Sequence, residues 1–169
     1  MRTELLAVVI GLGLASCDPA SMPGTSIGTY ATTGHIATNT CGTSLGAPDP
    51  YSFNVMLSKD STTLYWKYAD QSDTVSGVLD ATNQATISTS QESNVDGTDA
   101  GAGPCTMDRT DTVVVKLDSV TAPSAFTGSL TYGFAAAAGS NCSDQLATSG
   151  GTYQTLPCTV SYTLTATKN

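Results

Sequence analysis

Apolar and polar residues alternate along most of the chain from residue 28 onward, which is the period of a β-strand with one buried face. The last alternating stretch is the most regular, with Cys158, Val160, Tyr162 and Leu164 separated by threonines and a serine. No convincing amphipathic helix is indicated after residue 16. About eight strands are predicted, which in chain order contain Tyr30 to Thr38; Phe53, Val55 and Leu57; Leu64, Trp66 and Tyr68; Val75, Gly77 and Leu79; Ala85 and Ile87; Val113, Val115 and Leu117; Phe126 to Phe134; and Cys158 to Leu164.

Short turn-forming stretches such as Lys59-Asp60-Ser61 and Asp80 to Asn83 separate several of these strands. Neighbouring strands joined so tightly pair antiparallel. The edge strands of an open eight-stranded sheet expose unpaired backbone groups, and closure into a barrel removes these edges. The sequence therefore predicts an all-β fold, an antiparallel barrel of roughly eight strands, with a two-sheet β-sandwich as the alternative. Residues 93–104 are rich in Gly, Ala and Asp, and they predict an exposed loop.

The N-terminal segment has a different pattern. An apolar run from Leu5 to Leu14 is too short to cross a membrane but suits a signal peptide. It ends in Leu14-Ala15-Ser16-Cys17, which resembles the lipobox of bacterial lipoprotein precursors. The resemblance implies that residues 1–16 are removed and that Cys17 becomes an acylated N-terminus carrying chains such as palmitate. The alternatives are an ordinary secretory signal and a buried first strand.

The segment that follows is short and polar. Residues 17–26 include Pro19, Pro23 and Gly24, and this composition predicts a flexible tether rather than part of a core. Residues 27–169 then form one domain of ordinary size.

The formal charge of the chain is −8, and charged residues make up only 12% of it. An acidic surface repels phosphate groups, which argues against nucleic acid as a partner and against docking on anionic lipids through a basic patch. The chain has one histidine, so it offers almost no material for histidine-based acid–base or metal chemistry.

Four cysteines are left once Cys17 is assigned to the lipid. An even number in an exported chain predicts two disulfides, and three pairings are open. We favour Cys41–Cys105 and Cys142–Cys158, because the second pair lies 16 positions apart and flanks a turn-rich stretch. Zinc is the weaker alternative, since the chain contains no Cys-x-x-Cys and no histidine near these cysteines.

Three features of the sequence are candidates for a catalytic or metal-binding site. Residues 42–46 match the Gly-x-Ser-x-Gly nucleophile motif, but no helix is indicated after them and His35 precedes them, so a chance match is favoured. His35 is expected to face solvent. Asn94, Asp96 and Asp99, followed by Asp108 and Asp111, could offer oxygen ligands to calcium, although a solvated acidic loop is favoured. The sequence thus predicts no catalytic residue, no metal and no cofactor.

Several aromatic residues occupy inward positions of the predicted strands, and a filled core is the expectation for a barrel of this size. Gly28-Thr29-Tyr30 resembles the Gly-x-Trp that opens lipocalin-type barrels, with tyrosine in place of tryptophan, and residues 52–90 resemble their consecutive hairpins. The resemblance covers about the first half of the domain and does not extend to a C-terminal helix. It implies that the barrel could bind a small apolar ligand. The inward aromatic positions make Trp66, Tyr68, Phe126, Tyr132 and Phe134 the candidate lining residues.

Two functional hypotheses follow. The first is a lipid-anchored protein of the cell envelope, at the outer membrane, the periplasmic face or the cell surface. It would serve as a non-enzymatic structural or surface-interaction module, with the membrane and an envelope protein as partners. The second is a lipocalin-like binder or carrier of a small apolar ligand.

Overall fold

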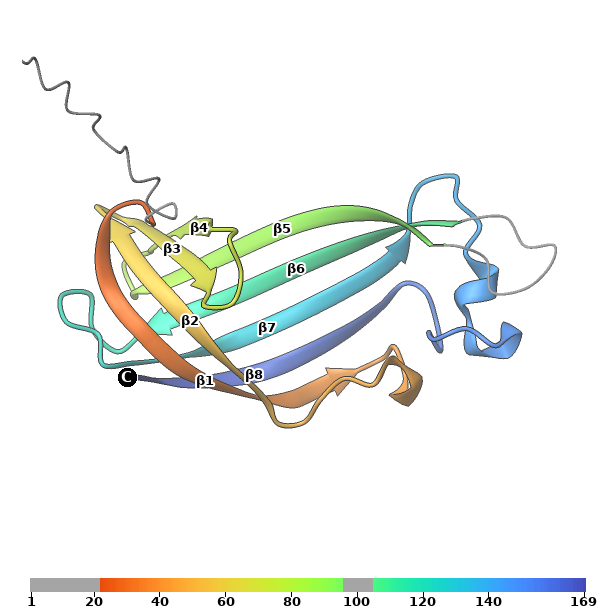
Figure 1. Cartoon of the computed structure of the whole chain (residues 1–169), viewed down its shortest axis with the longest axis horizontal. Coiled ribbons are helices and arrows are strands. Elements are labelled where there is room, and N and C mark those ends of the chain that lie inside the picture. Colours follow the sequence, from red (N-terminus) through yellow and green to blue (C-terminus); the bar gives the residue numbers. More distant parts are fainter. Residues whose placement is uncertain (1–21, 96–104) are drawn as a thin grey trace, which may run out of the picture.

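The computed structural model describes residues 22–95 and 105–169. In these residues, eight strands form a single antiparallel sheet (Figure 1). The strands are β1 (Thr25–Asn39), β2 (Tyr51–Asp60), β3 (Thr63–Tyr68), β4 (Val75–Val78), β5 (Gln84–Val95), β6 (Cys105–Leu117), β7 (Ala125–Ala136) and β8 (Cys158–Lys168). Within the described residues, the helical structure consists of three short 3-10 turns, η1 (Thr43–Leu45), η2 (Ser143–Gln145) and η3 (Ala147–Ser149).

The sheet curves into a nearly closed barrel with the order β4-β3-β2-β1-β8-β7-β6-β5. The first strand pairs with the last, for example Ile36 with Tyr162, and every other pairing joins strands that follow each other in the chain. The two ends of the sheet, β4 and β5, meet at a bridge between Leu79 and Ala85. The predicted eight-stranded barrel is confirmed, and the alternative of a two-sheet sandwich is wrong.

Closure stops part-way along β5. Gly77 on β4 lies against the backbone of Thr86, so closely that a Cβ there would overlap the Thr86 carbonyl oxygen. Beyond this point β4 has ended, and within the described part of the chain residues 88–95 of β5 pair only with β6. In that part of the chain, one side of the barrel is therefore open along the second half of β5.

The interior is filled by the inward residues that the alternation predicted. Trp66 and Phe126 are each 1% exposed, and their ring centroids lie 5.7 Å apart. Tyr30 lies 5.5 Å from Phe126, and its hydroxyl donates to the carbonyl oxygen of Pro123 at 2.9 Å. Each such side chain contributes about 1.5–3 kcal/mol when it is fully buried. The other fully buried large side chains are Leu57, Leu64, Ile87, Leu130, Leu164, Val55, Val115, Val160 and Tyr162.

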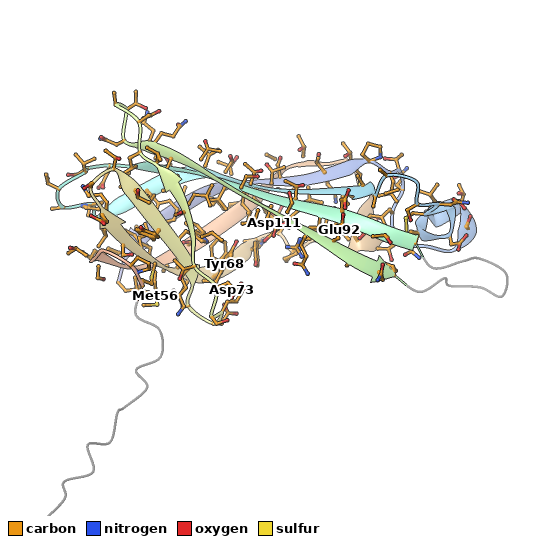
Figure 2. All side chains as sticks on the ribbon, turned by 90° about the horizontal axis from the view of Figure 1, so that it is seen from above. Met56, Tyr68, Asp73, Glu92 and Asp111 are labelled. Atoms are coloured by element: carbon orange, nitrogen blue, oxygen red, sulfur yellow. A yellow bond between two sulfur atoms is a disulfide. The ribbon has the colours of Figure 1, made fainter. Side chains whose placement is uncertain are left out.

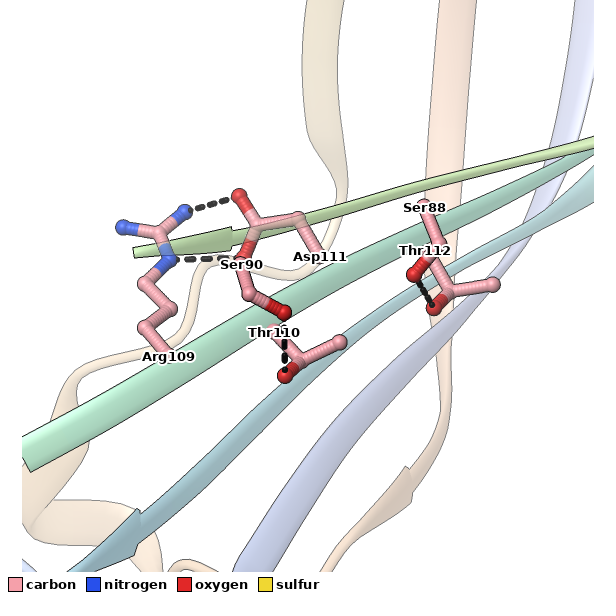
Figure 3. Close-up of polar contacts among 6 residues, drawn as sticks. All are labelled: Ser88, Ser90, Arg109, Thr110, Asp111 and Thr112. Carbon is pink, nitrogen blue, oxygen red and sulfur yellow. Dashed lines mark hydrogen bonds and ion pairs between the residues drawn. The ribbon is translucent and has the colours of Figure 1, made fainter. Parts of the chain in front are cut away.

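The outer wall carries hydroxyl groups that pair across the strands. Ser88 and Thr112 are hydrogen-bonded at 3.1 Å, and the pair of Ser90 and Thr110 lies one step along the same strands at 3.3 Å (Figure 3). The outer side of the alternating pattern therefore corresponds to the polar face of the sheet.

Both disulfides lie toward the end of the barrel where β1 ends and β8 begins. Cys41 is bonded to Cys158, and Cys105 is bonded to Cys142. The involvement of all four cysteines is confirmed, but the pairing that we favoured is wrong. Cys41 follows the end of β1, which runs beside the start of β8, so these two cysteines meet although 117 positions separate them. Cys142 and Cys158 are close in sequence but do not pair, because Cys142 lies near the start of β6, where Cys105 is its partner.

Two predicted boundaries also differ from the structure. β1 begins at Thr25, within the stretch expected to be a tether, and Thr25 pairs with Lys59. β5 continues to Val95, so residues 93–95 of the predicted loop belong to a strand that pairs with the start of β6. The rest of that loop, residues 96–104, lies outside the described residues.

Peptide mapping without reduction is expected to recover Cys41 linked to Cys158 and Cys105 linked to Cys142. Because loop-closure entropy grows with loop length, replacing the first pair by alanines should cost roughly 1 kcal/mol more of the free energy of unfolding than replacing the second. Denaturant unfolding of the two double variants measures this difference. Recovery of a Cys41–Cys105 peptide would contradict the fold at the end of β1.

The mouth of the barrel as a candidate binding site

Five aromatic side chains from β2, β3, β7 and β8 form a layer across the bore. Their contacts run from Tyr132 through Tyr162, Tyr51 and Phe53 to Tyr68, with ring centroids 6.3, 5.5, 4.9 and 5.2 Å apart in that order. Tilted and edge-to-face pairs of this kind each contribute about 0.5–1.5 kcal/mol beyond the area that they bury. We call these five residues the aromatic tier.

Tyr51, Tyr68 and Tyr132 influence one another electrostatically within the tier. Burial raises the pKa of Tyr68 to about 12, and it also raises the pKa of Tyr132, with a further contribution from the neighbouring tyrosines. These two hydroxyls therefore stay protonated at neutral pH and can donate hydrogen bonds.

An ion pair lies next to the tier on β6. Arg109 donates from Nε to Oδ1 of Asp111 at 2.7 Å and from Nη2 to Oδ2 at 2.8 Å (Figure 3). The hydrogen bond to Asp111 raises the pKa of Arg109. The guanidinium carbon also lies 4.7 Å from the ring centroid of Tyr132, a cation–π distance. Because the pair is bidentate and stacked, its orientation is fixed although both side chains are partly exposed.

Two pockets open at this level of the barrel. The first, which we call the aromatic pocket, has a volume of about 280 Å³ and lies between the β1–β2 connection and the inner faces of β6, β7 and β8. Its walls include Tyr51, Tyr132, Phe134 and Tyr162, and Arg109 is its one charged residue.

The second pocket, which we call the β4–β5 cleft, occupies the gap where the sheet stays open and has a volume of about 240 Å³. Its floor includes Trp66 and Val113, and Asp111 contributes to its wall. The Arg109–Asp111 pair thus stands between the two pockets, since Arg109 lines one and Asp111 lines the other.

The five candidate lining residues are divided among three places. Tyr132 and Phe134 line the aromatic pocket, whereas Trp66 and Tyr68 line the β4–β5 cleft. Phe126 packs between Tyr30 and Trp66 in the filled core and lines neither of these pockets. The bore below the tier is occupied by side chains, so the pockets lie at its mouth rather than at its centre.

The pairing of Arg109 with Asp111 is not among the features predicted from the sequence. A signal was present, because both residues share the inward phase of β6 with Val113, Val115 and Leu117. A charged side chain on the inward face of a strand needs a partner or a ligand. The alternation shows that the face is inward, but it cannot show that Tyr132 on β7 lies beneath the guanidinium.

The other patterns tested for chemistry do not converge on a site. Ser44 lies in η1 and makes no hydrogen bond to His35 within the described part of the chain, so the nucleophile elbow is not formed. His35 is exposed, as expected, and its Nδ1 lies 3.0 Å from Asp49. Asn94 accepts a hydrogen bond from Thr106 on the outer face of the sheet.

The calcium hypothesis is only partly covered by the structure, because residues 96 and 99 lie outside the described residues. Within residues 22–95 and 105–169, no group of three or more His, Cys, Asp or Glu side chains is placed to hold a metal ion. The same two ranges contain no helix with the length and apolarity needed to span a membrane.

Comparison of the chain with protein-family models, with curated proteins and with solved structures finds no match. Functional interpretation therefore depends on the residues of this chain alone.

Proposed function

We propose that this chain is a lipoprotein of the bacterial cell envelope, anchored through acyl groups on Cys17. Its barrel would act in a structural or surface-interaction role rather than as an enzyme. The observation that carries the proposal is the Leu14-Ala15-Ser16-Cys17 stretch at the end of an apolar run too short to span a membrane. Cys17 itself lies outside the described residues.

The use of the other cysteines supports export. All four form disulfides, which persist in oxidising compartments such as the periplasm and the cell surface. These two bonds use the four cysteines other than Cys17, so acylation of Cys17 would not compete with either of them. A stable anchor needs two or more acyl chains, since a single chain binds a bilayer only marginally.

The topology determines which end of the barrel would face the membrane if Cys17 is the anchor. β1 begins at Thr25, eight positions after Cys17, and at most about 28 Å of extended chain can separate the two. The first residue of β1 and the C-terminus lie at one end of the barrel, and the β7–β8 connection lies at the other (Figure 1). An anchor at Cys17 would therefore leave the barrel mouth facing away from the membrane.

A second candidate function is the binding of a small apolar ligand in the aromatic pocket. The specific observation in its favour is the composition of the walls, where four aromatic rings and several aliphatic side chains surround a volume of about 280 Å³. The resemblance of Gly28-Thr29-Tyr30 to the opening of lipocalin-type barrels supports the same proposal. The ligand would lie on the tier, at the mouth of the barrel.

Metabolic labelling with an alkyne analogue of palmitate tests the anchor. The wild-type chain is expected to take up the label and to fractionate with membranes, because acylation of Cys17 would hold it there. Cys17→Ser should abolish labelling, whereas the pair Cys105→Ala and Cys142→Ala should retain it as a matched control. Labelling that persists in Cys17→Ser would contradict the lipobox interpretation.

Fluorescence of N-phenyl-1-naphthylamine, an uncharged apolar probe, tests the second candidate. To avoid detergent, the mature chain would carry Cys17→Ser behind an ordinary signal peptide. Phe134→Ala, which removes one pocket wall, should weaken binding about tenfold, since burying a large apolar side chain is worth about 1.5–3 kcal/mol. Val120→Ala, an exposed apolar residue elsewhere, serves as the control. Equal affinities of the two variants would exclude this pocket as the binding site.

A further inference from the structure

The β4–β5 cleft combines an apolar floor with polar walls, which distinguishes it from the aromatic pocket. Trp66, Val75, Ile87 and Val113 supply apolar surface from four different strands. Polar side chains surround this surface on the β3–β4 connection, on β5, on β6 and at the end of β3. The polar lining residues are Tyr68, Gln71, Asp73, Thr89, Ser90, Gln91 and Asp111.

Figure 2 shows how these groups are arranged: Tyr68 and Asp73 lie at the β3–β4 side of the opening, and Asp111 lies across from them on β6. The open edge of β5 runs past the same cleft, because no strand of residues 22–95 or 105–169 pairs with the second side of residues 88–95. A molecule in the cleft would therefore meet hydrogen-bonding side chains from both sides and backbone groups along one edge.

The charges in the cleft restrict what it can bind. Asp111 is balanced by its two hydrogen bonds to Arg109. Asp73 accepts a hydrogen bond from Ser72 at 3.2 Å and has no ion-pair partner among the described residues. None of the described lining residues is a lysine, arginine or histidine. An anion would thus meet an unbalanced carboxylate, and a divalent cation would find only one uncompensated acidic group.

Trp66 adds an independent observation. It is 1% exposed and lines the cleft, yet its Nε1 donor has no hydrogen-bond acceptor within the described part of the chain. A buried indole N–H usually has a partner, because leaving it unpaired costs about 1–3 kcal/mol. Because the accessible surface of Nε1 is below 1 Å², a ligand oxygen would supply this acceptor only after neighbouring side chains shift to admit it.

We propose that the β4–β5 cleft is a binding site for a neutral saccharide. A sugar ring has an apolar C–H face that can pack against the half-buried Val75 at the margin of the apolar floor, and its rim of hydroxyl groups both donates and accepts hydrogen bonds. Asp73 accepts from such hydroxyls, whereas the amides of Gln71 and Gln91 can donate as well as accept. The volume of about 240 Å³ corresponds to the share of roughly eight water molecules, which suits a single ring.

This site is separate from the aromatic pocket and does not depend on lipidation. The three residues that face the sugar most directly in this account are Asp73, Gln91 and Thr89. None of them belongs to the filled core, since the side chains lie at the opening of the sheet.

The test uses the full chain, purified in a detergent without a sugar headgroup. Cellotriose, maltotriose and chitotriose are three uncharged probes that differ in linkage and substituents, and isothermal titration calorimetry measures their binding. Trp66 is the only tryptophan, so its fluorescence reports occupancy of the cleft at the same time. At least one trisaccharide is expected to bind and to change the emission of Trp66.

Two variants connect the binding to the cleft. Asp73→Ala and Gln91→Ala should each raise the dissociation constant about tenfold, because each removes a hydrogen bond to the ligand. Glu92→Gln is the matched control: it is the next residue on β5, lies in the outward phase, and should leave the constant unchanged. Absence of binding by all three sugars, or binding that neither cleft variant weakens, overturns the proposal.

Discussion

Five aromatic rings that pack across the bore separate the filled core of this barrel from the pockets at its mouth. An eight-stranded barrel has an interior just wide enough for side chains to fill. The rings of five residues fill this width by packing against one another. They are Tyr51, Phe53, Tyr68, Tyr132 and Tyr162. Tyrosine suits the boundary because one end of its side chain is apolar and the other can remain hydrogen-bonded.

Below the tier the barrel is a packed core, and above it the strands continue as an incomplete wall. The upper parts of β5, β6 and β7 have no counterpart in the short strands β3 and β4, so the wall has a gap. The two disulfides lie in this upper part, where they join β1 to β8 and β6 to the β7–β8 connection. They tie strand ends and a long connection together in a region where fewer strands pack against one another.

The ion pair of Arg109 and Asp111 connects the tier to both pockets. Its bidentate geometry and the stacking on Tyr132 keep a charged group on an otherwise apolar inner face. The result is a mouth with two distinct chemistries on either side of one pair, aromatic toward β8 and mixed polar toward β5. In an anchored protein this mouth would face outward, where a ligand could reach it.

Much of the fold was predictable because strand alternation is a local signal. It identified the inward residues of β2, β3, β6, β7 and β8, and Asp80 forms the predicted turn by accepting hydrogen bonds from the backbone of Thr82 and Gln84. The disulfide pairing was not predictable in this way, because it depends on β1 lying beside β8 after 117 intervening positions. The site was only partly predictable for a similar reason. The alternation marks Tyr68, Tyr132 and Arg109 as inward, but their meeting depends on where each strand begins and on the gap beside β4.

Fluorescence quenching of Trp66 by acrylamide tests most directly whether the tier seals a filled core. Trp66 is the only tryptophan in the chain, and it lies just inside the tier, 5.7 Å from Tyr68. Its emission is expected at short wavelength, with quenching about an order of magnitude slower than that of free tryptophan, because its side chain is buried. Tyr68→Ala should expose Trp66 and speed quenching, whereas Tyr65→Ala, on the outer face of the same strand, should not. Fast quenching of Trp66 in the wild-type chain would show that its side chain is accessible and would contradict the buried position on which this account depends.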